Sequence, residues 1–169
     1  MRFAAPFLLL LVACTHASPT PGPSPTPASS SELVGMWRLV EMVNVRDDGK
    51  TTPSFLGPHP TGYIVYDRAG RMAVQLMGDP RPTFRDVDHP SCEEAKAAYE
   101  SFVAYAGTYT YDSVRRIVTH QLEMSLWPPG VGKAFSREVR LDGDRVVLLT
   151  EPHSDRSRLR LTWERVRPP

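Results

Sequence analysis

From residue 36 onward, the chain is divided into short segments in which apolar and polar residues alternate, separated by turn sequences. Alternation with a period of two is typical of strands that have one buried face. Several connections are very short, for example at 67–70 and 142–144, and strands joined in this way pair antiparallel. Such a chain buries its apolar faces by packing strand against strand, which restricts it to all-β architectures.

The pattern predicts eight strands. They lie at 36–46, in the two arms of 62–77, at 107–112 and 116–125, in the two arms of 134–151, and at 156–167. Proline-rich loops are expected at 51–61 and 78–90. An open sheet would expose strand edges, whereas a closed barrel has none. We therefore expect an eight-stranded antiparallel up-and-down barrel, with a two-sheet sandwich as the alternative fold.

One segment has a helical period instead. Ser91 followed by Glu94 forms the sequence signature of a capping box, and Gly107 is a suitable residue to end a helix. The apolar residues between them recur at helical spacing; they are Ala95, Ala98, Tyr99, Phe102 and Ala106. The sequence therefore predicts one amphipathic helix at about 92–106.

The N-terminal residues 1–13 are typical of a signal peptide, with a short basic start and an apolar run too short to span a bilayer. The sequence Leu-Val-Ala-Cys ending at Cys14 resembles the lipobox of bacterial lipoproteins. That resemblance implies cleavage before Cys14 and acylation of its new N-terminus with palmitate-like chains, which would anchor the protein in a membrane. An ordinary secretory signal is the alternative. Thr15 is not the aspartate that marks retention in the inner membrane, so we expect the outer membrane of a bacterial cell envelope.

Residues 14–31 are rich in Pro, Ser and Thr and hold no aliphatic residue larger than alanine. This composition favours an extended tether between the lipidated Cys14 and a folded domain at 32–169. If Cys14 carries lipid, Cys92 has no partner within the chain. The domain must then fold without a disulfide, and we expect it to be a monomer.

The last strand indicates how the barrel closes. Leu159, Leu161, Trp163 and Arg165 share one face of this strand. Because that face is apolar, the Arg165 guanidinium begins inside and needs an aromatic or carbonyl partner. Trp37 lies where the first and last strands would meet, so we predict that Arg165 packs on Trp37. The alternative is that Arg165 extends into solvent at the rim.

Two features at the ends of the predicted barrel resemble a lipocalin. Gly35, Met36 and Trp37 resemble the Gly-x-Trp of the first lipocalin strand, and Arg165 resembles the last-strand arginine that packs across that tryptophan. A closer resemblance, to the bacterial lipocalin-like domain family, covers most of the chain from residue 33. It rests on LVGMWRLVEMVNV, PTGYIVYDRAGRMAVQLM, YAGTYTYD, VTHQLEMSLWP, RLDGDRVVLLT and LTWERV. The resemblance implies a small single barrel with its helix after the third strand.

A barrel of this size has room for one small ligand, so polar residues in the inward phase are the candidate ligand-binding residues. His120 shares a face with Val118, Leu122 and Met124. It is either a neutral core histidine bonded to a hydroxyl or a polar contact for a ligand. We include Met124 on the same face as a ligand contact.

Four further candidates come from other strands. Glu41 is in phase with the buried face of the first strand, and would face inward unless a bulge turns it out. Tyr63 and Tyr66 lie on opposite faces of one strand, so one of them must face the interior. Tyr109 completes the set of candidates.

Other chemistry lacks support in the sequence. With 20 Lys and Arg against 19 Asp and Glu, the charge does not indicate a nucleic-acid binder. No motif identifies a metal site, a cofactor, a serine nucleophile or a phosphate loop. The sequence predicts a membrane-anchored lipoprotein whose barrel binds a small apolar or amphipathic molecule. The alternatives are a barrel enzyme of the isomerase or cyclase type that uses His120, and a structural or interaction module with a filled barrel.

Overall fold

The computed structural model describes residues 32–167. The predicted signal peptide, the lipidation site Cys14 and the tether at 14–31 lie outside the described residues. Within 32–167, no helix combines the length and apolar character needed to cross a membrane.

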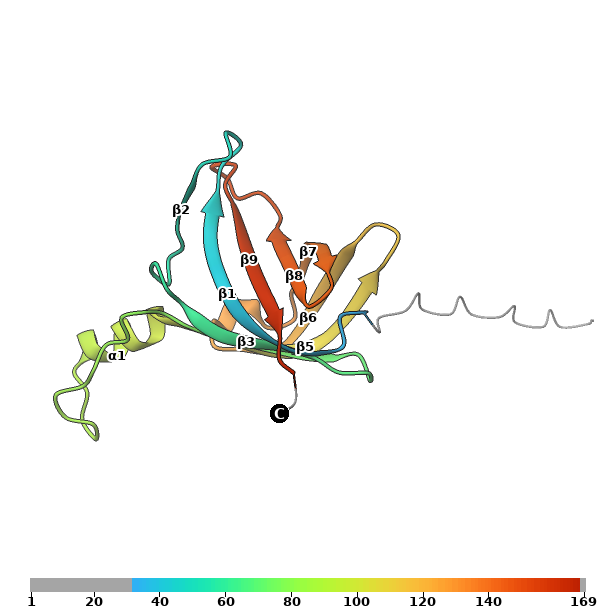
Figure 1. Cartoon of the computed structure of the whole chain (residues 1–169). Helices are drawn as coiled ribbons and strands as arrows, with labels where there is room; N and C mark the ends of the chain where they lie inside the picture. The colour runs from blue at the N-terminus through green and yellow to red at the C-terminus, as the bar shows by residue number, and fades with distance from the viewer. Residues whose placement is uncertain (1–31, 168–169) are drawn as a thin grey trace, which may run out of the picture.

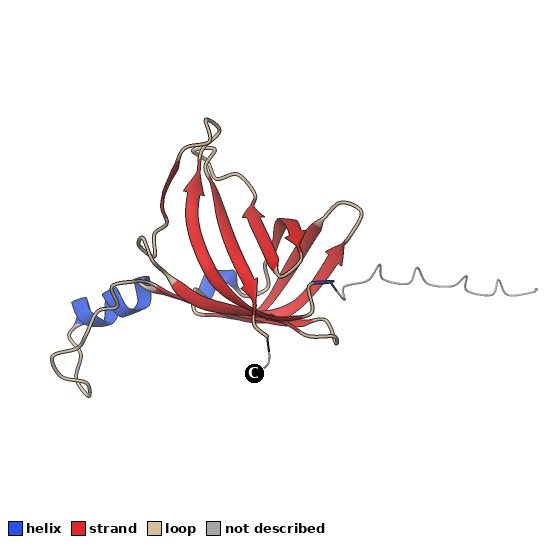
Figure 2. Cartoon of the chain, viewed as in Figure 1, coloured by secondary structure: helices blue, strands red, loops and turns tan. Residues whose placement is uncertain are grey.

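Strands are the main regular elements of the described chain (Figures 1 and 2). In chain order the elements are β1 (Gly35–Val45), β2 (Thr51–Pro53), β3 (Thr61–Tyr66), β4 (Arg71–Met77), α1 (Cys92–Glu100), β5 (Phe102–Asp112), β6 (Ile117–Ser125), the 3-10 helix η2 (Pro128–Gly130), β7 (Ala134–Asp142), β8 (Arg145–Thr150) and β9 (Arg158–Arg165). The turns at 67–70 and 142–144 join hairpins as predicted.

All nine strands belong to one antiparallel sheet in the order β2-β1-β3-β4-β5-β6-β7-β8-β9, and β1 also pairs with β9. That last pairing closes the sheet. The short β2 pairs only with the far end of β1, from Val43 to Val45, so the other eight strands form the closed wall. The predicted eight-stranded up-and-down barrel is confirmed.

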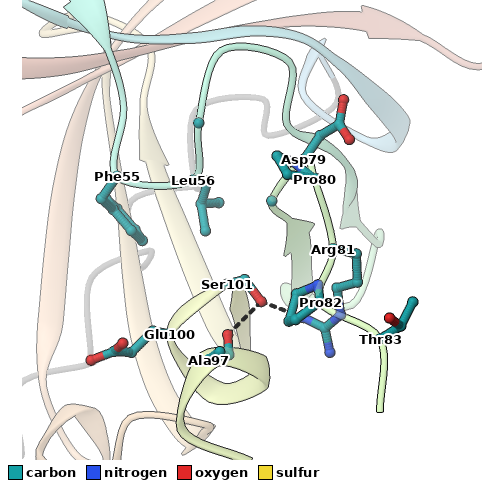
Figure 3. Close-up of a pocket in the computed structure, with 12 residues that line it drawn as sticks. Phe55, Leu56, Asp79, Pro80, Arg81, Pro82, Thr83, Ala97, Glu100 and Ser101 are labelled. Atoms are coloured by element: carbon teal, nitrogen blue, oxygen red, sulfur yellow. Dashed lines mark hydrogen bonds between the residues drawn. The ribbon is translucent and has the colours of Figure 1, made fainter. Parts of the chain in front are cut away.

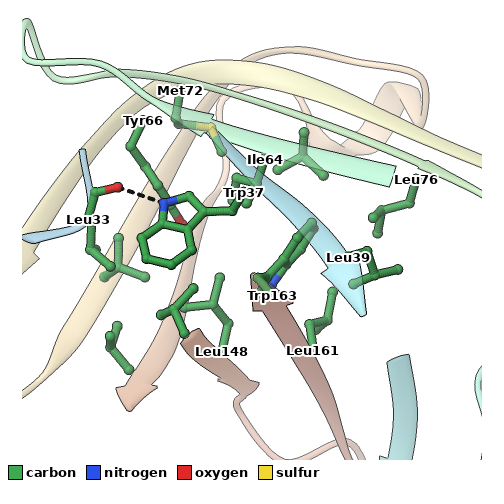
Figure 4. Close-up of a cluster of buried hydrophobic side chains, with 14 of the residues drawn as sticks. Leu33, Trp37, Leu39, Ile64, Tyr66, Met72, Leu76, Leu148, Leu161 and Trp163 are labelled. Carbon is green, nitrogen blue, oxygen red and sulfur yellow. Dashed lines mark hydrogen bonds between the residues drawn. The ribbon is translucent and has the colours of Figure 1, made fainter. Parts of the chain in front are cut away.

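The strand alternation explains where the core lies. In β4, buried and exposed residues alternate without exception, which is the pattern of a wall with one face inside. The buried side chains form one cluster within the barrel, part of which is drawn in Figure 4. The largest fully buried side chains of the described residues are Trp37, Trp163, Tyr66, Leu33, Ile64, His120, Val118, Val139 and Val146.

The helix α1 is shorter than the sequence predicts. Its capping box at Ser91 and Glu94 is present, but it ends at Glu100, and Ser101 rather than Gly107 caps it. The chain continues directly into β5 at Phe102 because Val103 and Tyr105 pack against the barrel core. The helix itself has no buried residue and lies beside the barrel (Figure 1). The prediction that this helix packs an apolar face into the core is therefore wrong.

Gly107 has a different role. It lies within β5, where a Cβ atom at this position would come 1.9 Å from the backbone oxygen of Gln121 on β6. The two strands approach too closely there for any side chain.

One end of the barrel is closed around Trp37, which is fully buried and donates its indole N–H to the Leu33 carbonyl over 2.9 Å (Figure 4). The Arg165 guanidinium lies 4.0 Å from the centroid of the Trp37 ring. Its two terminal nitrogens donate to the carbonyls of Val34 and Glu32, over 2.8 and 2.9 Å. The cation therefore has both an aromatic face and carbonyl oxygens as partners.

Gly35 makes this arrangement fit. Its φ of +135° lies in the region that favours glycine, and a Cβ atom there would come 2.8 Å from Nη1 of Arg165. A side chain at residue 35 would both strain the backbone and displace the guanidinium.

Arg165→Ala should reduce the free energy of unfolding by about 2–4 kcal/mol, because it removes a cation–π contact and leaves two carbonyl groups without their donor. Arg38→Ala provides the matched control, since Arg38 pairs with Glu164 at the exposed surface over 2.9 Å and should cost at most about 1 kcal/mol. Urea denaturation of both variants measures the difference. Equal losses would show that Arg165 contributes no more than a surface ion pair.

Candidate functional site

The barrel interior holds a cavity of about 150 Å³. Its wall is mostly aliphatic, with contributions from all the long strands and from Phe55 in the loop between β2 and β3. Five lining residues carry a polar group, namely Tyr105, His120, Arg137, Thr150 and Trp163. An apolar cavity with a few polar groups directed to it is the usual form of a small-molecule site.

His120 on β6 is 1% exposed and lies between two tyrosines. The Tyr66 hydroxyl of β3 is 2.7 Å from His120 Nε2, and the Tyr105 hydroxyl of β5 is 3.3 Å from Nδ1. The two tyrosines therefore hold both ring nitrogens. Tyr66 belongs to the packed closed end, whereas Tyr105 lines the cavity, so the histidine connects these two regions.

Burial sets the protonation of this group. It lowers the pKa of His120 to about 3, and the nearby positive charge of Arg137 contributes in the same direction. Burial also raises the pKa of the Tyr66 and Tyr105 hydroxyls. All three side chains are therefore neutral at physiological pH.

The hydrogen-bond partners fix the direction of the proton chain. Within residues 32–167, the Tyr66 hydroxyl has one hydrogen-bond partner, His120. A buried O–H without an acceptor is costly, so Tyr66 donates to Nε2 and the imidazole proton resides on Nδ1. His120 then donates to the Tyr105 oxygen, and the Tyr105 proton is left for another acceptor.

Arg137 on β7 brings a permanent positive charge to the cavity wall. It is half-buried, donates to the carbonyl of Ser136 over 2.8 Å, and lies over the Phe135 ring at 5.6 Å. Its charge and a hydrogen-bonding contact act on the Tyr105 hydroxyl, opposing the rise in its pKa. None of the salt bridges between described residues involves Arg137.

Three sequence-predicted candidates face away from the interior. Glu41 is exposed and pairs with Arg160 over 3.1 Å, because a bulge between Leu39 and Glu41 shifts the register of β1. Tyr63 is 44% exposed on the outer face of β3. Met124 is 65% exposed, beyond a register shift in the β5–β6 pairing. For Glu41 the structure therefore shows the alternative, in which a bulge turns the side chain outward. The expectation that Met124 faces inward is wrong, and Tyr66 is the inward member of the tyrosine pair.

Tyr109, the remaining candidate, is 5% exposed. It packs edge-on against Tyr66 with ring centroids 4.7 Å apart, and donates its hydroxyl proton to the Asp67 carbonyl over 2.8 Å. It belongs to the core, opposite His120 in the β5–β6 pairing, and does not line the cavity.

Sequence reasoning missed Arg137 and Tyr105. Arg137 is two residues from the buried Val139 on β7, so the alternation used for the last strand would have placed it inward. Tyr105 fell inside the predicted helix, where alternation has no meaning. Correct placement of the helix end would have revealed it.

A larger cleft of about 590 Å³ lies outside the barrel, between α1 and the loop after β4 (Figure 3). The basic side chain of this cleft is already paired, since Arg81 donates to the Ala98 carbonyl and the Ser101 hydroxyl, both over 3.1 Å. Phe55 borders both this cleft and the interior cavity. Because the inward polar side chains meet in the interior, we consider the interior cavity as the candidate site. No group of His, Cys, Asp and Glu among the described residues could hold a metal ion.

Comparison with known proteins gives three findings. A family model described as "Lipocalin-like domain" matches residues 34–166. The chain is 31% identical over 88 residues to the 4'-hydroxy-3'-methoxypropiophenone carrier protein ppsC of Aspergillus oryzae, an alignment that covers 47% of this chain and 78% of that protein. It is also similar to the crystal structure of the lipoprotein YedD from Klebsiella pneumoniae, with a TM-score of 0.40 and 11% identity, covering 85% of this chain and 78% of the other.

Protonation of His120 should make stability depend on pH. Its pKa of about 3 in the folded chain is below the value of about 6.5 expected when unfolded, so the unfolded chain binds the additional proton. The contribution of a neutral His120 is complete above pH 6.5 and is lost as the pH falls toward 3, by roughly 1.4 kcal/mol per pH unit.

Urea denaturation at several pH values between 6.5 and 4 measures this slope. His120→Gln should reduce the proton uptake on unfolding by about one proton. His89→Gln, at an exposed histidine, is the control and should leave the slope as it is. An unchanged slope in His120→Gln would contradict the prediction.

Proposed function

The chain belongs to the lipocalin-like domain family, whose model spans residues 34–166, and from this premise we propose that its barrel binds and carries a small apolar or amphipathic molecule. The observation that carries the proposal is the interior cavity of about 150 Å³. A dry cavity of about this size accepts a single aromatic ring in other proteins. The occupant we propose is therefore about the size of one substituted ring.

The fungal relative supports the proposal of a small-molecule carrier. Its name describes a carrier of 4'-hydroxy-3'-methoxypropiophenone, a molecule with one aromatic ring and polar oxygen substituents. An apolar wall with a small number of polar groups suits ligands of that general kind.

His120 favours a carrier over a catalyst. With a pKa of about 3, it is a weak proton acceptor near neutral pH, where a general base works best with a pKa near the working pH. Its two tyrosine partners also occupy both ring nitrogens. We propose that His120 orients the Tyr105 hydroxyl toward the bound molecule.

We further propose that the protein acts in the bacterial cell envelope, anchored to the outer membrane by lipid on Cys14. The support is the lipobox-like Leu-Val-Ala-Cys sequence and the proline-rich segment that follows it. Several acyl chains on one cysteine would give stable anchoring. A tether of this composition would hold the barrel clear of the lipid surface.

Filling the cavity tests the carrier function. Val103 lines the cavity, whereas Val65 is exposed on the outer face of β3. Benzyl alcohol titrated into the unlipidated Cys14→Ser chain should shift NMR resonances of cavity-lining residues in a saturable way. Val103→Trp should weaken this binding about tenfold or more, equivalent to 1.4 kcal/mol, because the indole occupies the space of the ligand.

Val65→Trp is the matched control and should bind as the parent chain does. Equal binding by both variants would place the ligand elsewhere.

Cys14→Ser tests the anchor. The substitution removes the thiol that receives the lipid, so the protein should move from the membrane fraction to the soluble fraction and lose incorporation of labelled palmitate. Cys92→Ser removes the exposed free thiol of α1 and should change neither result. A membrane-bound Cys14→Ser protein would refute lipidation at this residue.

A further inference from the structure

The cavity wall contains an orphaned hydrogen-bond donor. Among the described residues, Nε1 of Trp163 is the one buried side-chain nitrogen or oxygen atom without a partner. Trp163 is 1% exposed and lines the cavity. Leaving such a donor unpaired costs free energy, and buried polar groups are ordinarily paired. This donor therefore points to a missing acceptor.

A second donor comes from Tyr105. The proton chain from Tyr66 through His120 supplies a donor to the Tyr105 oxygen, so the hydroxyl proton of Tyr105 remains to be donated. Because Tyr105 lines the cavity, a bound molecule can accept it.

Arg137 adds charge to these two donors. Its guanidinium carries further N–H groups beyond the one bonded to Ser136. No Asp or Glu lines the cavity, and no described carboxylate forms a salt bridge with this guanidinium. The cavity wall is therefore positive.

The acceptors of the wall are already used. His120 Nε2 receives the Tyr66 proton in the arrangement deduced above. The Thr150 hydroxyl donates to the Glu151 carbonyl over 2.9 Å and accepts from the Leu159 N–H over 3.0 Å. The side chains of the cavity thus present mainly donors and positive charge, and their remaining acceptors are second lone pairs of hydroxyl oxygens.

We propose, on the basis of the carrier function above, that the cavity selects small organic carboxylic acids in their anionic form, with the carboxylate bound by Arg137 and Tyr105. Guanidinium and carboxylate match in geometry and form paired charge-assisted bonds. The apolar body of the ligand lies against the aliphatic wall. Trp163, four residues along β9 from the cavity-lining Leu159, belongs to the wall beside that body.

Charge is the basis of the selection. A carboxylic acid with a pKa of about 4 is ionised at neutral pH, and its anion neutralises the unpaired guanidinium in the partly dry cavity. A neutral ligand of the same size gains the apolar contacts only. A ligand with an amine would bring a second positive charge close to the Arg137 guanidinium.

Isothermal titration of the full chain carrying Cys14→Ser with benzoate and with benzyl alcohol tests this selectivity. Benzoate should bind at least about tenfold more tightly than benzyl alcohol, since hydrogen bonds to charged groups are the stronger ones. Arg137→Gln should abolish that preference and leave the affinity for benzyl alcohol within about twofold. Arg140→Gln is the matched control, because Arg140 is exposed on the same strand, and it should keep the preference.

The outcomes separate the two proposals. Equal or tighter binding of benzyl alcohol by the parent chain would overturn the selectivity and leave the carrier function intact. If neither benzoate nor benzyl alcohol binds, both the selectivity and the carrier function are overturned. Should circular dichroism show that Arg137→Gln does not fold, Tyr105→Phe serves instead. It should weaken benzoate more than benzyl alcohol, and an equal effect on both would overturn the proposal.

Discussion

The pairing of the first strand with the last is the constraint on which the rest of the barrel depends, and the Arg165 guanidinium over the Trp37 ring lies at its closed end. Three features converge there: the φ of Gly35, the carbonyls of Glu32 and Val34, and the ring itself. A cation at this depth is tolerable only with such partners. Once β1 and β9 are joined in this register, each intermediate strand has a defined inward face.

Closure divides the interior into a packed half and a hollow half. Trp37, Tyr66 and Tyr109 occupy the closed end, where bulky rings fill the space between strands. Toward the other end the inward residues are mainly aliphatic, and they leave the cavity of about 150 Å³. The hollow region is therefore a consequence of where the large side chains lie along the strands. His120 lies at the boundary, because it bonds to Tyr66 on one side and Tyr105 on the other.

Alternation in the sequence predicted the strands, the closed barrel and the inward face of His120, because each follows from a period of two. Alternation left Glu41 with two possible orientations and placed Met124 on the wrong face, because a single inserted residue reverses the phase of everything beyond it. The bulges before Glu41 and between Ala106 and Gly107 depend on how two strands meet, and neither strand carries that information alone. Tyr105 was missed because the apolar residues up to Ala106 recur at helical spacing and predicted a longer helix. The helix ends at Glu100, because Val103 and Tyr105 pack against the barrel core as part of β5.

The hydrogen bonds among the buried polar groups all run one way, from Tyr66 through His120 to Tyr105. Tyr66 is packed so tightly that its proton has one available acceptor, and this fixes the tautomer of His120 and the orientation of the Tyr105 hydroxyl. A constraint at the closed end thus determines what the cavity offers to a ligand, even though the closed end does not contact that ligand. Trp163, which also lines the cavity, is the residue whose buried donor lacks a partner among the described residues. The Tyr105 hydroxyl and the Arg137 guanidinium then face the cavity together, and this pairing of a donor with a positive charge is the basis of the proposed preference for a carboxylate.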